Sequence, residues 1–237
     1  MKRLCHLIHQ IFLAEMSSMS RAPVRFMTSI LMAGLLFAPS SFALDLSLSE
    51  EAVREAYFLG QRNDENTAQV LAPYTRHLAL PEKGPYVSEI GLFTPYAQVI
   101  DTSRQRTGYY SAQEAQQDYR DRGDTIRVFI RIEFTATYGY PQAVASADSV
   151  AREQGIRVQP QDFWKDFCLG LSQNDKWIQP LTERAEAVYD QGEGGLGGAI
   201  VWLEFDAHDV ASTEASVEVE TPDGQHVVAT FDLSRLH

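Results

Sequence analysis

The sequence predicts an α+β fold, an antiparallel β-sandwich-like core with an N-terminal helical hairpin and short inserted helices. Several segments alternate apolar and polar residues with a period of two, which is typical of strands with one buried face. Turn residues rather than regularly spaced helices join these segments, and this arrangement favours antiparallel sheets. Helix start signals lie at the beginning and in the middle of the chain, so we expect helices beside the sheets.

The first 43 residues have the pattern of a secretory signal peptide. Arg21 and Arg25 precede an apolar run of about ten residues, and Ser41-Phe42-Ala43 supplies small residues for cleavage. The run is too short to cross a bilayer, which takes about 20 residues, so we expect cleavage and no stable membrane insertion afterwards. We predict translation from Met19 and a single exported domain, residues 44–237, in the periplasm or outside the cell.

The charge of the expected mature chain excludes some partners. Removal of residues 1–43 takes away four of the 20 basic residues and one of the 32 acidic residues, which leaves a net charge of about −15. Such a chain repels phosphate backbones and anionic lipid, so we expect neither nucleic acid nor a membrane surface as a partner.

The predicted elements begin with two helices. Ser47 and Glu50 have the spacing of a capping box before a helical run, and a second helix is expected from Asn63 to about Ala72, ended by Pro73. Extended structure is expected over Tyr86 to Asp101.

The later elements are predicted from the same signals, namely helix caps and the alternation of apolar and polar residues. Ser111 and Glu114 form a capping box for a helix that ends at Gly123. The following segments are then expected in order: a strand over 126–134, a short helix near Asp162, a strand over 167–171, a helix over 181–189, a strand over 199–206 and a hairpin of 215–221 with 225–233. The hairpin is indicated by Asp223-Gly224 between two alternating runs.

Two groups of residues carry the motifs that bear on binding. Asp206, His208 and Asp209 are candidate metal ligands if extended backbone places the first two on one face, although an acidic exit from a strand explains them as well. Arg127 and Arg131 are candidates for an anion or glycan surface, with ion pairs to Glu89, Glu133, Glu218 or Glu220 as the alternative. Neither group matches a known catalytic motif, so we predict no catalytic residues.

Two further motifs are expected to carry no chemistry. The glycines of residues 192–197 match a dinucleotide fingerprint, but a strand follows them instead of a helix, so we expect no cofactor. Cys5 lies in the segment expected to be removed, so Cys168 is expected to be an inert, buried thiol.

The sequence favours a non-catalytic binding or interaction domain over an enzyme. Its expected partner is a protein or a component of the cell envelope, contacted through sheet edges or the helical hairpin. Two alternatives remain, an exported hydrolase that uses acidic residues and a structural subunit of a homo-oligomer. A cleft lined with two acidic side chains would favour the hydrolase.

Overall fold

The structure is a computed structural model, and it describes residues 47–81, 84–106, 108–135, 162–189 and 196–236. All of these belong to one compact unit, Ala43–His237. The predicted signal peptide, its cleavage point and most of the glycine loop at 192–197 lie outside the described residues. None of the described helices is long and apolar enough to cross a membrane.

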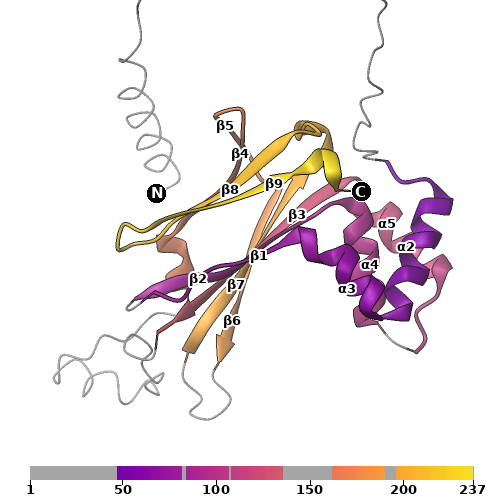
Figure 1. Cartoon of the computed structure of the whole chain (residues 1–237), viewed down its shortest axis with the longest axis horizontal. Helices are drawn as coiled ribbons and strands as arrows, with labels where there is room; N and C mark the ends of the chain where they lie inside the picture. Colours follow the sequence, from indigo (N-terminus) through magenta and orange to yellow (C-terminus); the bar gives the residue numbers. More distant parts are fainter. Residues whose placement is uncertain (1–46, 82–83, 107, 136–161, 190–195, 237) are drawn as a thin grey trace, which may run out of the picture. The chain divides into compact units, whose positions relative to one another are not determined.

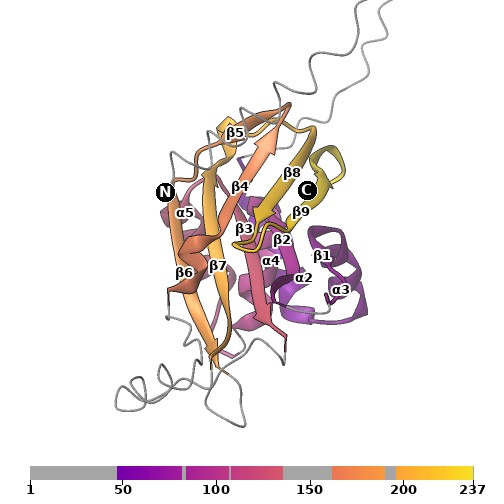
Figure 2. The same cartoon turned by 90° about the vertical axis from the view of Figure 1, so that its left-hand side faces the viewer.

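Two antiparallel sheets form the core, as predicted (Figure 1). The five-stranded sheet has the order β1-β2-β3-β7-β6 and the four-stranded sheet the order β5-β4-β8-β9. The strands of the first sheet are β1 Thr75–His77, β2 Pro85–Phe93, β3 Thr125–Phe134, β6 Thr182–Tyr189 and β7 Leu196–Asp206. Those of the second are β4 Cys168–Gln173, β5 Lys176–Ile178, β8 Glu214–Glu220 and β9 His226–Asp232, which Figure 2 shows from another side.

Among the described residues, the inner faces of both sheets contribute to one hydrophobic cluster. On β3 the even-numbered residues from Ile126 to Ile132 are fully buried, and they pair with the buried odd-numbered residues from Ala199 to Phe205 on β7. Val217 on β8 and Phe231 on β9 join the same cluster from the other sheet. The period of two in the sequence therefore divides each strand into a core face and an outer face.

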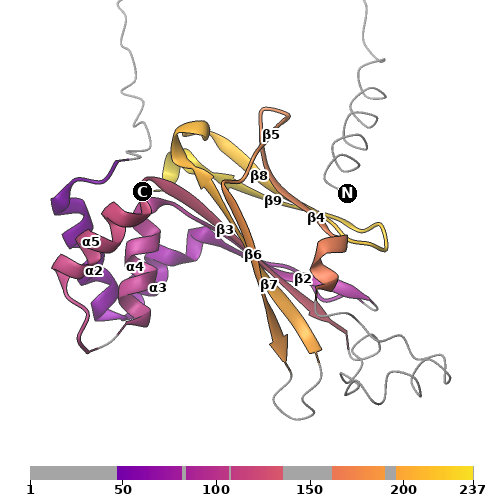
Figure 3. The same ribbon diagram turned by 180° about the vertical axis from the view of Figure 1, so that it is seen from behind.

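Four helices pack as one group, seen from behind in Figure 3. They are α2 Glu50–Arg62, α3 Glu65–Leu71, α4 Pro95–Gln105 and α5 Ala112–Arg122. The first two form the predicted hairpin, but their caps differ from the prediction. Ser49 caps α2 and Asp64 caps α3, while Asn63 takes a left-handed conformation (φ 45°) that ends α2. The predicted cap Ser47 instead donates a hydrogen bond to Asp124.

The expectation of extended structure over Tyr86 to Asp101 is wrong in its second half. β2 ends at Phe93, and α4 begins at Pro95. Thr94 accepts a hydrogen bond from the Ala97 N–H as N-cap, and proline fits the first helical position because it lacks the N–H that would have no partner there. Buried Gln98 then ties α4 to the sheet by donating to the carbonyls of Phe93 and Thr125.

The helix expected over 181–189 is wrong, because this segment is the strand β6. It pairs with β7 along its whole length, from Thr182 opposite Glu204 to Tyr189 opposite Leu196. Strand pairing with β7 therefore overrides the helix propensity of its Ala, Glu and Arg residues. The other elements expected between 111 and 233 are confirmed, including the capping box of Ser111 with Glu114 and the final hairpin.

Two short strands escaped the sequence analysis. β1 is three residues long and follows a short helical turn, Ala72–Tyr74. β5 forms a tight hairpin with β4, in which Asn174 and Asp175 both have positive φ, 52° and 59°. Asn and Asp tolerate this conformation at the two central positions of such turns.

Two half-buried tyrosines link the helices to the loop before α5. The Tyr57 hydroxyl donates to the Tyr110 carbonyl at 2.8 Å, and the Tyr110 hydroxyl donates to Asp118 Oδ2 at 3.0 Å. Burial, followed by the hydrogen bond to Asp118, raises the pKa of Tyr110 to about 12.

This pKa predicts a loss of stability at high pH. The folded chain holds the Tyr110 proton more tightly than the unfolded chain, where the pKa is about 10. The free energy of unfolding should therefore fall as the pH rises from about 10 to about 12. Denaturant titrations across this range should show a smaller fall for Tyr110→Phe. Phenolate absorbance should show the pKa of Tyr110 lowered in Asp118→Asn, and an unchanged titration would contradict the assignment.

Candidate functional site

The predicted anion surface lies on the outer face of the five-stranded sheet, where its arginines have acidic partners. Arg127 Nη2 is 3.1 Å from Glu204 Oε1, and Arg131 Nε is 3.2 Å from Glu89 Oε2. The pairing of Arg131 with Glu89 is the sequence-based alternative, and Glu204 is a partner that the sequence analysis did not name. Because these guanidinium groups are neutralised by neighbours, they offer little free positive charge to a ligand.

A row of aromatic rings crosses the same outer face. Tyr74 stacks on Phe93, Phe93 stacks on Phe129, and the Phe129 ring is 5.4 Å from that of Trp202. The Phe129 ring occupies the space above Gly91, where a Cβ atom would lie 2.0 Å from it. Arg127 and Arg184 both approach the Trp202 ring, at 5.9 and 5.5 Å from its centroid. The indole is thus packed by protein groups on this face.

The backbone turns at the candidate metal ligands. β7 ends at Asp206, and the next three residues form a short helical turn, Ala207–Asp209. Asp206 Oδ1 accepts a hydrogen bond from the His208 N–H at 2.9 Å, so its carboxylate caps this turn. Extended backbone, on which the metal hypothesis depended, is therefore not present at His208. In the described ranges, no three His, Cys, Asp or Glu side chains gather closely enough to hold a metal ion.

Cys168 differs from its expected state. It is half-buried at the start of β4 and is disulfide-bonded. The inert, buried thiol that the sequence analysis expects at this position is therefore not what the structure contains.

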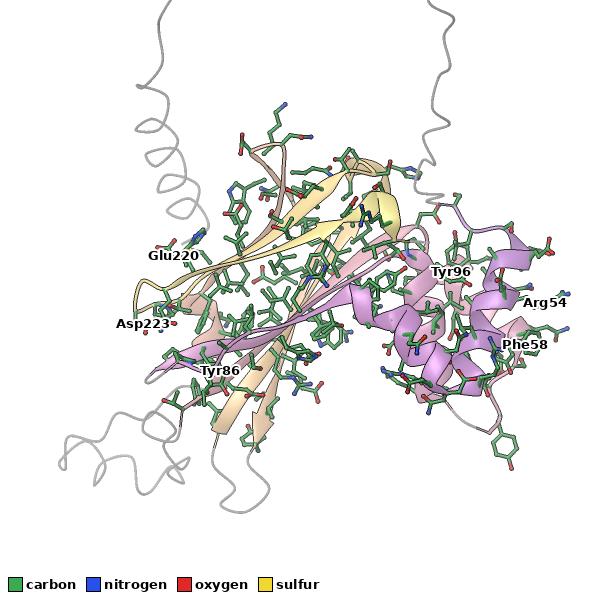
Figure 4. All side chains as sticks on the ribbon, viewed as in Figure 1. Arg54, Phe58, Tyr86, Tyr96, Glu220 and Asp223 are labelled. Carbon is green, nitrogen blue, oxygen red and sulfur yellow. The ribbon has the colours of Figure 1, made fainter. Side chains whose placement is uncertain are left out.

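A groove among the helices is lined by both apolar and charged side chains. Its volume is about 650 Å³, within the range of ligand pockets. The lining residues come from α2, α3 and α4, and they are Glu55, Phe58, Leu59, Arg62, Asn66, Val70 and Tyr96. The four α2 residues recur at intervals of three and four, which places them on one side of the helix. Figure 4 shows Phe58 on α2 and Tyr96 on α4.

Phe58 is the most unusual residue of this groove. Its side chain is 58% exposed, although phenylalanine is normally buried. The neighbouring groove residue Leu59 is buried, and Val70 is half-buried. An apolar side chain entering the groove would therefore cover Phe58 and remove its surface from water, which is favourable.

The groove walls are held by hydrogen bonds within the hairpin. The Thr67 hydroxyl donates to the Leu59 carbonyl at 2.7 Å, and Asp64 Oδ1 accepts from the Thr67 N–H at 3.0 Å. On the other side of α2, the Gln61 side-chain amide donates to the Ser103 carbonyl of α4 at 2.6 Å. These bonds hold α2 against both neighbouring helices. The groove is therefore formed before a ligand binds, and binding costs less conformational free energy than if the helices had to be ordered.

The charges around the groove have opposite signs at its two ends. Glu55 and Arg62 lie seven residues apart on α2, which corresponds to about 10 Å along a helix axis. Burial, and then the negative charge of Glu55, raises the pKa of Tyr96. The α2 side of the groove thus carries a carboxylate, two apolar side chains and a guanidinium group.

Sequence reasoning predicted the helical hairpin but not this groove. In the sequence, Phe58 cannot be distinguished from the buried apolar residues of its helix. Its exposure becomes visible only when α3 and α4 are placed, because no described residue covers its ring. The nearest signal in the sequence is the pair Tyr57-Phe58, because two adjacent aromatic residues on a helix cannot both face one core.

Comparisons with known proteins supply no further constraint on this groove or on the sheets. Neither the scan against models of protein families nor the search of curated proteins finds a match to the chain. The candidate function therefore rests on the geometry described above.

Proposed function

We propose that this chain is an exported, non-catalytic binding protein whose helical groove receives an apolar side chain of a partner protein. The observation that carries the proposal is the exposure of Phe58 beside the preformed groove of α2, α3 and α4. The signal-peptide pattern supports a partner in the cell envelope or outside the cell. The excess of acidic residues disfavours nucleic acid.

The charges of the groove define the chemistry of the partner. A partner helix lying antiparallel along α2 would present a basic residue to Glu55, an apolar residue to Phe58 and an acidic residue to Arg62. Helix-in-groove recognition uses such anchors, spaced by three, four or seven residues. We therefore assign the groove to an amphipathic helix of a partner protein.

The groove favours binding over hydrolysis of glycosidic bonds. A glycosidase needs two carboxyl groups that face the substrate from opposite sides. Of the seven residues that line the groove, Glu55 is the single acidic one. The arrangement suits recognition by shape and charge, and the hydrolase alternative gains no support from it.

A selection experiment tests this function. A displayed library of amphipathic helical peptides is selected on the purified protein, and the peptides are then measured against variants. We expect Phe58→Asp to weaken the selected peptides at least about tenfold, because the residue lies at the centre of the contact. Val228→Ala, which changes another exposed apolar residue on β9, should leave their affinity unchanged. Peptides that bind the Phe58→Asp variant as tightly as the parent chain would contradict the proposal.

A further inference from the structure

The strand β6 is the last strand at one edge of the five-stranded sheet. Within the described residues, β7 pairs with one side of β6 and no strand pairs with the other. β6 is eight residues long, whereas β1 at the opposite edge has three. Proteins commonly keep edge strands short because an open edge pairs readily with another strand.

The ends of this edge are apolar. Leu181, directly before β6, is 60% exposed, and Tyr189, its last residue, is 43% exposed. A neighbouring strand that covers both residues would remove their apolar surface from water.

Two charged residues on the outer face of β6 have no ion-pair partner in the described part of the chain. Arg184 lies opposite Trp202 and Glu186 opposite Ile200, so both side chains lie on the outer face. Arg127 and Arg131 on β3 each have a carboxylate partner on that face, whereas the Arg184 guanidinium lies over the Trp202 ring. Their opposite charges suit a partner strand that carries the same two residues in reverse order.

We propose that a second copy of this chain pairs antiparallel with β6 across a two-fold axis at Ala185. This register places Arg184 opposite Glu186 of the other copy, twice by symmetry, and Leu181 opposite Tyr189. The two five-stranded sheets then form one continuous sheet. This dimer is independent of the helical groove, so either proposal can fail without the other.

The charges select this register among the neighbouring ones. Residues that lie opposite each other on antiparallel strands point to the same face of the sheet. A two-fold axis must therefore pass between two copies of one residue, and the alternative registers place that axis at another residue of β6. An axis at Arg184 would place the two Arg184 side chains opposite each other, and an axis at Glu186 would do the same with the two carboxylates. Like charges directly opposite are destabilising, so the axis at Ala185 is the favourable one.

Charge variants and sedimentation test the interface. The purified protein should sediment as a dimer. Arg184→Glu and Glu186→Arg should each raise the dimer dissociation constant about tenfold, since each places like charges opposite one another. The double variant Arg184→Glu/Glu186→Arg restores opposite charges and should dimerise within about threefold of the parent chain. A monomer at about 0.1 mM, or a dimer indifferent to both single changes, would overturn the proposal.

Oxidative cross-linking tests the register even if a charge variant folds poorly. In Ala185→Cys the two introduced thiols lie on the axis, at a Cβ separation of about 5 Å that a disulfide can span with a small adjustment. In the matched control Ala187→Cys they lie four residues out of register, about 13 Å apart along the strands. Both variants keep Cys168, which is disulfide-bonded, so the introduced cysteine supplies the free thiol that distinguishes them. Covalent dimers of Ala185→Cys alone are expected, and equal cross-linking of both variants would contradict the register.

Discussion

Replacing Phe231 by alanine should lower the free energy of unfolding by about 3–5 kcal/mol. The ring is fully buried on the inner face of β9, and it belongs to the core cluster that both sheets share. Its loss removes apolar contacts and leaves a cavity that the closely packed sheets cannot close. The Arg76 guanidinium, 4.8 Å from the ring centroid, would lose its aromatic partner as well.

Denaturant unfolding measures this effect, with Val228→Ala as the matched control. Val228 lies on the same strand but is 46% exposed, so its truncation should change the free energy of unfolding by no more than about 0.5 kcal/mol. Equal effects of the two substitutions would contradict a core that is shared by the two sheets.

Gly60→Ala should destabilise the chain by about 1–3 kcal/mol, although alanine favours helices. A Cβ atom at Gly60 would lie 2.4 Å from the Ile100 carbonyl oxygen and 2.7 Å from Ser103 Cβ, both on α4. The first contact is with backbone, so α2 and α4 would have to move apart. This close crossing also positions the α2 side of the groove.

The sign of the Gly60→Ala effect separates two explanations. If helix propensity dominated, the substitution would stabilise the chain by about 1 kcal/mol. Glu51→Ala changes an exposed position in the first turn of the same helix and should have little effect. Thermal unfolding of the three proteins shows which explanation holds, and a stabilised Gly60→Ala chain would contradict the close crossing.

The elements that the sequence predicted well carry local signals that agree with their packing. The alternation over 126–134 appears as β3, the capping box at Ser111 begins α5, and Gly224 with φ 84° closes the final hairpin. In each case, the residues that set the backbone conformation and those that pack against the core indicate the same element.

The errors occur where tertiary structure decides. The segment 182–189 contains good helix formers, yet pairing with β7 makes it a strand. At α4 the signal was present, because Thr94-Pro95 is a cap followed by a favourable first helical residue, but the aromatic and β-branched residues nearby suggested a strand. The groove depends on how three helices meet, which no local pattern encodes.

The candidate site residues show the same division. The sequence offered Glu89 as one of four possible acidic partners for the arginines of the outer face, and in the structure Glu89 pairs with Arg131. It did not indicate that the backbone turns after Asp206, which removes His208 from the expected face. Partners on neighbouring strands can be predicted from the register of the strands. The end of a strand depends on whether an acidic side chain caps the next turn, and the sequence does not distinguish such a residue from other acidic residues.

A charge exchange across the helical groove tests the central claim most directly. A helical peptide selected on the parent chain is measured against Glu55→Lys, together with a version of the peptide whose basic residue is replaced by glutamate. We expect each mismatched combination to bind about tenfold more weakly, and the doubly exchanged combination to recover to within about threefold of the original affinity. Equal affinities in all four combinations, or a loss without recovery, would contradict binding along the line from Glu55 to Arg62.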